Sequence, residues 1–230
     1  MIYVELQKYR NSLYHIPKRS LQYLFALLMI SWCGICFAGA TGASRDEEKE
    51  AEVQLSLGDA YMTSGKYKEA KEAFKQAIRL RPDHAVSHFK LGMVYGILNS
   101  EMDEIEAYKQ AIRLKPDYAE AYYNLGKAYG KLGNDTAEID AYINAISVKP
   151  DYADAFMDLG SVYMRSRRYK DARKAYEQAV ILKPGNAEAY FYLGIVYIRL
   201  HDKGAAFDQY RILKGLDQRK AEELFNQIYP

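Results

Sequence analysis

Residues 119–152 read AEAYYNLGKAYGKLGNDTAEIDAYINAISVKPDY, and the features of this stretch recur along the chain every 34 residues. The recurring prolines are Pro82, Pro116, Pro150 and Pro184. The recurring Leu-Gly pairs begin at Leu57, Leu91, Leu125, Leu159 and Leu193, and a tyrosine stands three residues after each glycine. A fixed period of this length is typical of a stacked array of similar units.

Helical geometry explains the pattern within one unit. When the alanines at 51, 85, 119, 153 and 187 are taken as position 1, positions 4, 7, 8 and 11 share one face of a helix. Glycine inside a helix costs about 1 kcal/mol relative to alanine, so its recurrence at position 8 predicts a second helix passing very close. Proline then ends that second helix. The sequence therefore predicts five antiparallel helix pairs, at residues 51–84, 85–118, 119–152, 153–186 and 187–220.

The repeat resembles the tetratricopeptide repeat family. The third repeat shows the family pattern at Tyr122, Leu125-Gly126, Tyr129, Tyr142, Ala145 and Pro150. Departures are Glu104 and Glu138, where the family has a small residue, and Leu213 in a fifth repeat that lacks the proline. The resemblance implies an all-α, right-handed superhelical solenoid of helix pairs, with a concave groove that holds ligand peptides.

The end of the chain predicts a capping helix. Residues 219–230 are amphipathic, with Leu224, Phe225 and Ile228 expected to point inward. A terminal repeat needs such a cover because each pair buries its apolar face only against its neighbours. A partner-binding arm is the alternative interpretation of this segment.

The first forty residues predict export. A basic stretch precedes the apolar run 21–40, and small residues at 38–40 suit cleavage of a signal peptide before Thr41. The run is also long enough to be a retained membrane anchor, and a buried cytosolic helix is a third possibility. The positive charges before the run place the repeats outside the cytoplasm in both membrane-related cases, which predicts a periplasmic or extracytoplasmic protein. Residues 41–50 are predicted to be a polar linker.

Signals for catalysis are weak. Cys33 and Cys36 have the spacing of a redox dithiol, but no βαβ pattern surrounds them, so a thiol oxidoreductase is kept only as a remote alternative. The histidines at 84, 88 and 201 do not form a metal-ligand set. We predict a non-enzymatic protein with no cofactor and no metal. Basic and acidic residues nearly balance beyond residue 40, which argues against a nucleic-acid ligand.

In the family, positions 2, 5, 6, 9, 12 and 13 of each first helix line the groove. The expected peptide-binding residues are Phe89, Met93, Tyr123, Asn124, Lys127, Met157, Arg165 and Phe191. Aromatic anchors beside mixed charge suit a partner peptide or helix with apolar side chains and some acidic residues. The alternative is that these aromatic residues pack between repeats and the charges are solvated. The predicted function is a scaffold or adaptor that binds a protein or peptide; a self-associating protein, or one that braces a membrane complex, is the second hypothesis.

Overall fold

The computed structural model of the chain describes residues 44–230, which contain eleven α-helices and no strand. The first helices of the repeats are α3 (Arg45–Thr63), α5 (Ala85–Ile97), α7 (Ala119–Lys131), α9 (Ala153–Arg165) and α11 (Ala187–Arg199). The second helices are α4 (Tyr67–Leu80), α6 (Glu101–Leu114), α8 (Asp135–Val148), α10 (Tyr169–Leu182) and α12 (Lys203–Leu216), and α13 (Gln218–Ile228) follows them. The prediction of an all-α fold is therefore confirmed for the described part of the chain.

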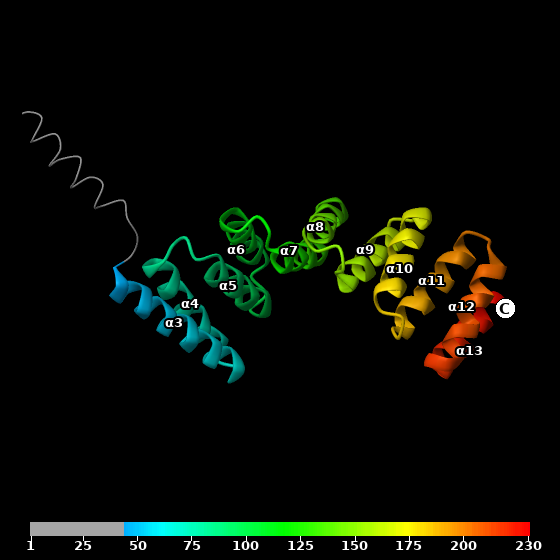
Figure 1. The fold of residues 1–230 in the computed structure, drawn as a ribbon, viewed down its shortest axis with the longest axis horizontal. Helices are drawn as coiled ribbons and strands as arrows, with labels where there is room; N and C mark the ends of the chain where they lie inside the picture. The colour runs from blue at the N-terminus through cyan, green and yellow to red at the C-terminus, as the bar shows by residue number, and fades with distance from the viewer. Residues whose placement is uncertain (1–43) are drawn as a thin grey trace, which may run out of the picture. The chain divides into compact units, whose positions relative to one another are not determined.

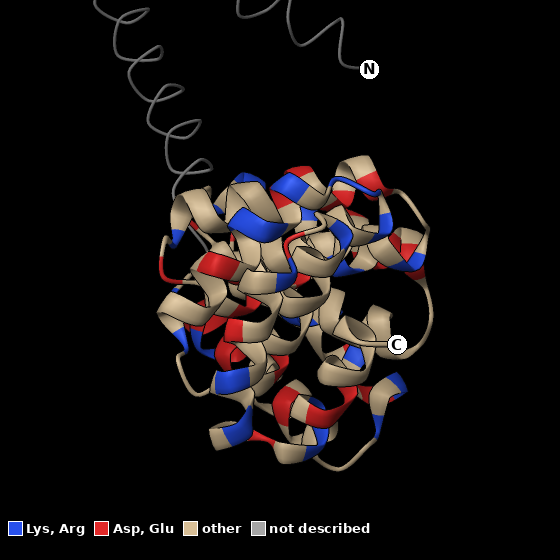
Figure 2. Ribbon diagram, turned by 90° about the vertical axis from the view of Figure 1, so that its right-hand side faces the viewer, with Lys and Arg blue, Asp and Glu red and all other residues tan. Residues whose placement is uncertain are grey.

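Residues 46–230 form one compact unit in which the helices follow one another in chain order (Figure 1). From α5 to α12, each first helix packs against the second helix of its own repeat, and each second helix from α4 to α10 packs against the next first helix. Basic and acidic side chains are interspersed over these helices (Figure 2). The core therefore runs through the row of repeats, and each repeat is buried by its neighbours.

The recurring glycine lets the two helices of a repeat approach. A Cβ atom at Gly126 would lie 2.6 Å from the ring of Tyr142, and one at Gly160 would lie 2.8 Å from the ring of Tyr176. Both tyrosine rings are almost fully buried. The position-8 glycines are thus sites of close helix packing, as their spacing predicts.

The last repeat is closed by α13. A Cβ at Gly194 would lie 2.5 Å from Leu224 of α13, whereas the same glycine in the earlier repeats faces an aromatic ring. Leu224 and Ile228 are fully buried. Phe225, predicted to point inward, is 37% exposed and instead lies against Tyr210. Adjacent helical residues point about 100° apart, so Leu224 and Phe225 cannot both face the core.

The start of the first repeat differs from the prediction of a polar linker. Residues 45–50 belong to α3, whose first turn carries Asp46, Glu47 and Glu48. Acidic side chains favour a helix N-terminus, and no glycine or proline separates them from Ala51. The predicted signal or anchor segment 1–40, with its two cysteines, lies outside the described residues. Within residues 44–230, no helix is long and apolar enough to cross a bilayer.

Candidate functional site

The candidate site lies on the side of α5, α7 and α9 that carries positions 5, 6, 9, 12 and 13 of each repeat, which we call the groove face. Two of the predicted aromatic anchors on this face pack within the protein. The ring of Phe89 lies 4.8 Å from that of Tyr118, and the ring of Tyr123 lies 5.0 Å from that of Tyr152. Both anchor rings are half-buried. They contribute edges to the groove face while holding neighbouring parts of the repeats together.

Three more predicted residues are also partly engaged. Met157 packs against the core of repeats 3 to 5. Phe191 contacts the cap region, where the Nζ of Lys220 lies 5.8 Å from its ring centre. The amide of Asn124 donates a 2.8 Å hydrogen bond to the carbonyl oxygen of Glu120, one turn earlier in α7. The side-chain amide of Asn124 is therefore already hydrogen-bonded within its own helix.

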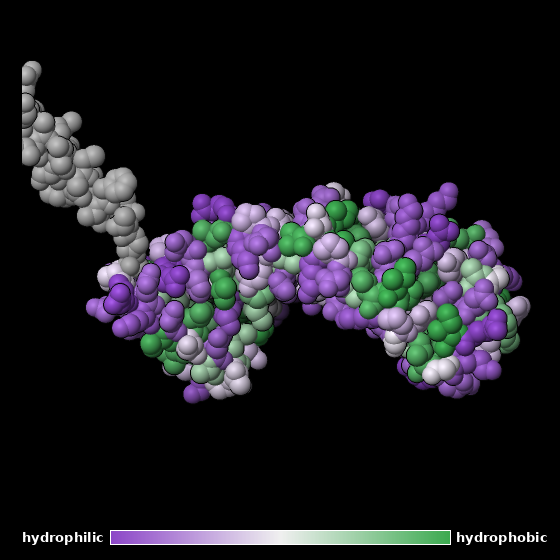
Figure 3. All heavy atoms as spheres, viewed as in Figure 1, coloured by the Kyte–Doolittle hydropathy of each residue, from purple (hydrophilic) through white to green (hydrophobic). Residues whose placement is uncertain are grey.

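The most open apolar spot on the groove face is on α5. Met93 is 39% exposed and Ile97 is 44% exposed, and the two residues are one helical turn apart. The neighbouring Lys90 is tied to Asp59 of the preceding repeat by a 2.6 Å ion pair. Hydrophobic side chains are exposed in several separate clusters on the side seen in Figure 3, and single exposed residues are common on any surface. Met93 and Ile97 differ by being adjacent on the face that carries the charged hollow described next.

A hollow opens between α7, α8 and α9. It is lined by Lys127, Gly130, Lys131, Glu138, Tyr142, Asp158, Ser161 and Arg165. These residues bring together three cations and two carboxylates from repeats 3 and 4. Two of the predicted site residues, Lys127 and Arg165, therefore lie in one depression.

Glycine makes room for the buried carboxylate of this hollow. Glu138 of α8 is only 6% exposed, and a Cβ at Gly130 would lie 2.7 Å from its carboxylate oxygen. Repeat 2 has the same arrangement, in which a Cβ at Gly96 would lie 2.5 Å from the carboxylate oxygen of the 4% exposed Glu104. Repeats 1 and 4 carry methionine and alanine at these two positions. The buried acid thus occupies the space that a methionine fills elsewhere.

The next repeat supplies the countercharge for each buried acid. The Nζ of Lys131 lies 2.8 Å from Glu104, and the guanidinium of Arg165 lies 2.7 Å from Glu138. Arg165 also contacts Asp135 at 2.6 Å. Burial raises the pKa of the Glu138 carboxyl, and the hydrogen bond from Arg165 opposes that rise. Separate hydrogen bonds from Arg165 and Ser166 hold the pKa of Asp135 below its usual range. Arg165, predicted to bind a ligand, is therefore committed to linking repeats 3 and 4.

A second carboxylate of the hollow is held by a tyrosine. The hydroxyl of Tyr123 donates a 2.8 Å hydrogen bond to Asp158. Burial raises the pKa of Asp158, and burial together with that bond raises the pKa of Tyr123. This pair joins α7 to α9.

Lys127 remains the available cation. Its side chain is exposed, its ammonium lies 5.6 Å from the ring centre of Tyr123, and it forms no ion pair with any residue in the described range. Lys131 is half-exposed but already paired. A ligand carboxylate can therefore reach the exposed ammonium of Lys127 without breaking an ion pair, although Tyr123 and Asp158 lie near that charge.

Comparisons with known proteins bear on the identity of the fold. Models of the tetratricopeptide repeat family match residues 58–97, 105–133, 85–118 and 157–221. A crystal structure of MamA protein is 30% identical, with 76% of this chain and 95% of that chain covered at a TM-score of 0.68. The chain belongs to the tetratricopeptide repeat family. A second crystal structure of MamA is 32% identical, covering 72% of this chain and 97% of the other at a TM-score of 0.67.

Another tetratricopeptide repeat structure supports the fold alone. YrrB, described as a TPR protein with an unusual peptide-binding site, is 17% identical, with 79% and 95% of the two chains covered at a TM-score of 0.66. A search of curated protein sequences gives no match. Tetratricopeptide repeat proteins are generally interaction scaffolds rather than enzymes. No group of three or more His, Cys, Asp or Glu residues within 44–230 could hold a metal.

Proposed function

We propose that this tetratricopeptide repeat protein is a non-enzymatic adaptor that binds a partner peptide or helix on its groove face at repeats 2 to 4. The observation that carries the proposal is the combination of an open apolar spot with an unpaired cation on one face. The apolar spot is Met93 and Ile97 on α5, and the cation is Lys127 on α7. The two helices are close at this face, since the Nζ of Lys131 donates a 3.5 Å hydrogen bond to the carbonyl oxygen of Gly96.

The chemistry of these groups specifies the partner. Methionine adapts its shape to different apolar surfaces, so Met93 with Ile97 suits a leucine, methionine or aromatic side chain. Lys127 suits a carboxylate placed near that side chain. The proposed ligand is a segment in which an apolar residue and an acidic residue lie close together. Half-buried Phe89 and Tyr123 lie on the same face, at position 5 of α5 and α7.

The direct test is capture of a partner by the full chain from an extract of its own cells, compared among variants. Met93→Asp and Lys127→Glu are each expected to reduce capture at least tenfold. Met93→Asp would bury a charge in the apolar contact, and Lys127→Glu would repel the acidic residue of the partner. Met102→Asp is the matched control, since Met102 is 72% exposed on α6, away from the groove face. Equal capture by all three variants, with unchanged helix content, would show that the groove face is not the binding surface.

We also propose that the repeats work outside the cytoplasm, because residues 1–40 have the charge and apolar pattern of an export segment. Trp32 is the only tryptophan and lies within that segment. Expression in a secreting bacterial host is expected to yield a chain that begins at Thr41 and lacks tryptophan emission. A full-length mass in the membrane fraction would indicate a retained anchor, and a full-length soluble chain in the cytoplasm would contradict export.

A further inference from the structure

One side of α3 is apolar and open. Val53, Leu57 and Ala60 stand at positions 3, 7 and 10 of the first repeat, which lie on one side of a helix. Val53 is 57% exposed, Leu57 is 38% exposed, and Ala60 is also exposed. The three residues, which we call the α3 outer face, form a continuous strip of small and large apolar side chains.

The same three positions are buried in the other repeats, where none is more than 8% exposed. Position 3 is Ser87, Ala121, Ala155 and Ala189; position 7 is Leu91, Leu125, Leu159 and Leu193; position 10 is Val94, Ala128, Val162 and Val196. The residue types in repeat 1 match this pattern. The α3 outer face therefore has the composition of a surface that is covered.

The cover in the other repeats is the second helix of the preceding repeat. Helices α4, α6, α8 and α10 lie against α5, α7, α9 and α11 respectively. In one example, Leu125 lies in a single core cluster with Ile105 and Tyr108 of α6. Within residues 44–230 no helix precedes α3. Residues 44–230 thus form this type of interface four times and leave the α3 side of a fifth one uncovered by any helix in that range.

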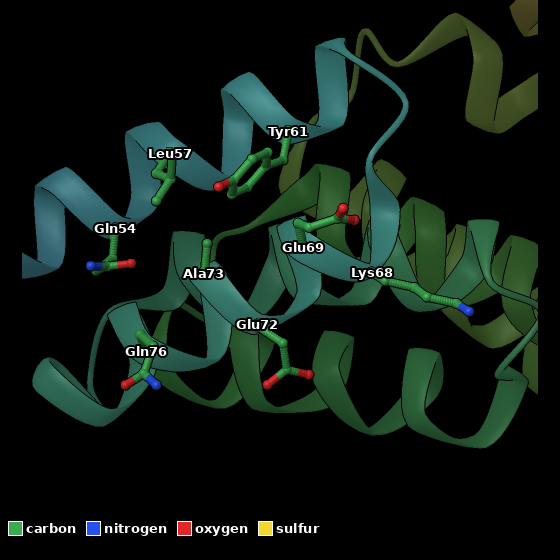
Figure 4. Close-up of a pocket in the computed structure, with 8 residues that line it drawn as sticks. All are labelled: Gln54, Leu57, Tyr61, Lys68, Glu69, Glu72, Ala73 and Gln76. Carbon is green, nitrogen blue, oxygen red and sulfur yellow. The ribbon is translucent and has the colours of Figure 1, made fainter.

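Figure 4 shows a hollow between the two helices of repeat 1, where Gln54, Leu57 and Tyr61 of α3 face Ala73 of α4. Its remaining lining residues are Lys68, Glu69, Glu72 and Gln76. Repeat 4 has a hollow at the equivalent positions although α8 packs against α9, so this hollow belongs to the repeat and is not created by the open end. The N-terminal part of α3 is acidic, since residues 45–52 contain five acidic residues and two basic ones. An occupant of the α3 outer face therefore needs an apolar ridge to cover Val53 and Leu57, and positive charge on it would complement the acidic first turns of α3.

We propose that the α3 outer face is a docking site for an amphipathic helix of a partner protein, with an apolar ridge like that of the second helices and basic residues on its flank. The repeated packing of second helices on first helices indicates that the occupant is a helix, and the acidic N-terminal part of α3 indicates that the occupant is basic. This site is separate from the groove face, so the two proposals stand or fall independently.

The probe is a labelled peptide with the sequence of residues 66–81, KYKEAKEAFKQAIRLR, which is the basic helix that covers α5 in the protein itself. The full chain is expected to bind it saturably in fluorescence anisotropy, with a gain of helical circular dichroism and weaker binding at high salt. Leu57→Lys is expected to weaken binding at least tenfold. The control Ile143→Lys changes an apolar residue of α8 that is 44% exposed and should leave binding unchanged.

Three results would overturn the proposal. The first is absence of peptide binding by a full chain whose circular dichroism shows folded repeats. The second is binding that Leu57→Lys leaves intact, since the peptide would then be held elsewhere. The third is a concentration-dependent oligomer that Leu57→Lys dissolves without any peptide binding, because a second copy would then cover this face. Val53→Lys, at the 57% exposed end of the strip, provides a second variant with little risk to folding.

Discussion

Gly130→Met is expected to lower the free energy of unfolding by about 3 kcal/mol, the upper part of the range for overpacking a filled interior. A Cβ at this position would lie 2.7 Å from the carboxylate oxygen of Glu138, and the longer methionine side chain would have to displace that buried, paired group. The gain in helix propensity from replacing glycine, somewhat under 1 kcal/mol, offsets only part of the cost. Urea unfolding followed by circular dichroism measures the loss.

Adding Glu138→Ala in the same chain is expected to recover most of that stability. The double variant reproduces the combination of Met164 with Ala172 in repeat 4, where methionine fills the space of the acid. A cycle of the two single variants and the double should therefore show a coupling energy of about 2 kcal/mol. Additive effects would mean that Gly130 and Glu138 do not share one space, contrary to the packing described above.

Arg165→Ala is expected to destabilise the protein by about 2 kcal/mol at pH 7. The substitution leaves the carboxylate of Glu138, which is 6% exposed, without its cation. This cost is below the roughly 3–5 kcal/mol for removing one partner of a fully buried ion pair, because the Arg165 side chain is half-exposed and water can reach the site. Arg199→Ala is the matched control, since Arg199 occupies the same position in repeat 5 and forms no ion pair in the described part of the chain.

The destabilisation caused by Arg165→Ala should become smaller as the pH falls. The pKa of Glu138 is raised in the folded protein, so the folded state takes up a proton at higher pH than the unfolded state and gains stability as pH falls through that window. Removing Arg165 raises the pKa of Glu138 further, because its hydrogen bonds to that carboxyl lower the pKa. The difference between Arg165→Ala and the parent should therefore shrink below neutral pH and disappear when Asp135 is also protonated. A difference that stays constant from pH 7 to acidic pH would contradict the pairing.

The period of 34 residues was enough to predict the helix pairs, because it combines a close-packing glycine with a helix-ending proline in every repeat. The inter-repeat ion pairs were not predicted. The sequence predicts Arg165 as a groove residue from its place at position 13 of the repeat. The period shows which face a residue is on, but not that Arg165 meets Glu138, which is 27 residues away. A signal was available, since Glu104 and Glu138 each follow a glycine by eight residues, whereas repeats with alanine there have methionine or isoleucine.

Whether a groove residue can bind a ligand depends on how far its side chain is exposed, and the repeat pattern does not show this exposure. The sequence allows either ligand anchoring or internal packing at position 5. In the structure Phe89 and Tyr123 lie against other tyrosines and stay half-exposed. Met93 and Lys127, both at position 9, are open to solvent. Ile97 was not among the predicted residues although it lies one turn beyond Met93. Their role in binding stays a prediction.

The most direct measurement is photo-cross-linking from single sites in the full chain. Benzoylphenylalanine would replace Met93 on the groove face in one chain and Met102 on α6 in another, and both would be irradiated in extract from the protein's own cells. We expect one discrete cross-linked partner from position 93 that is lost when Lys127→Glu is added, and none from position 102. A partner that cross-links from position 102 and not from position 93 would show that the groove face does not bind the ligand.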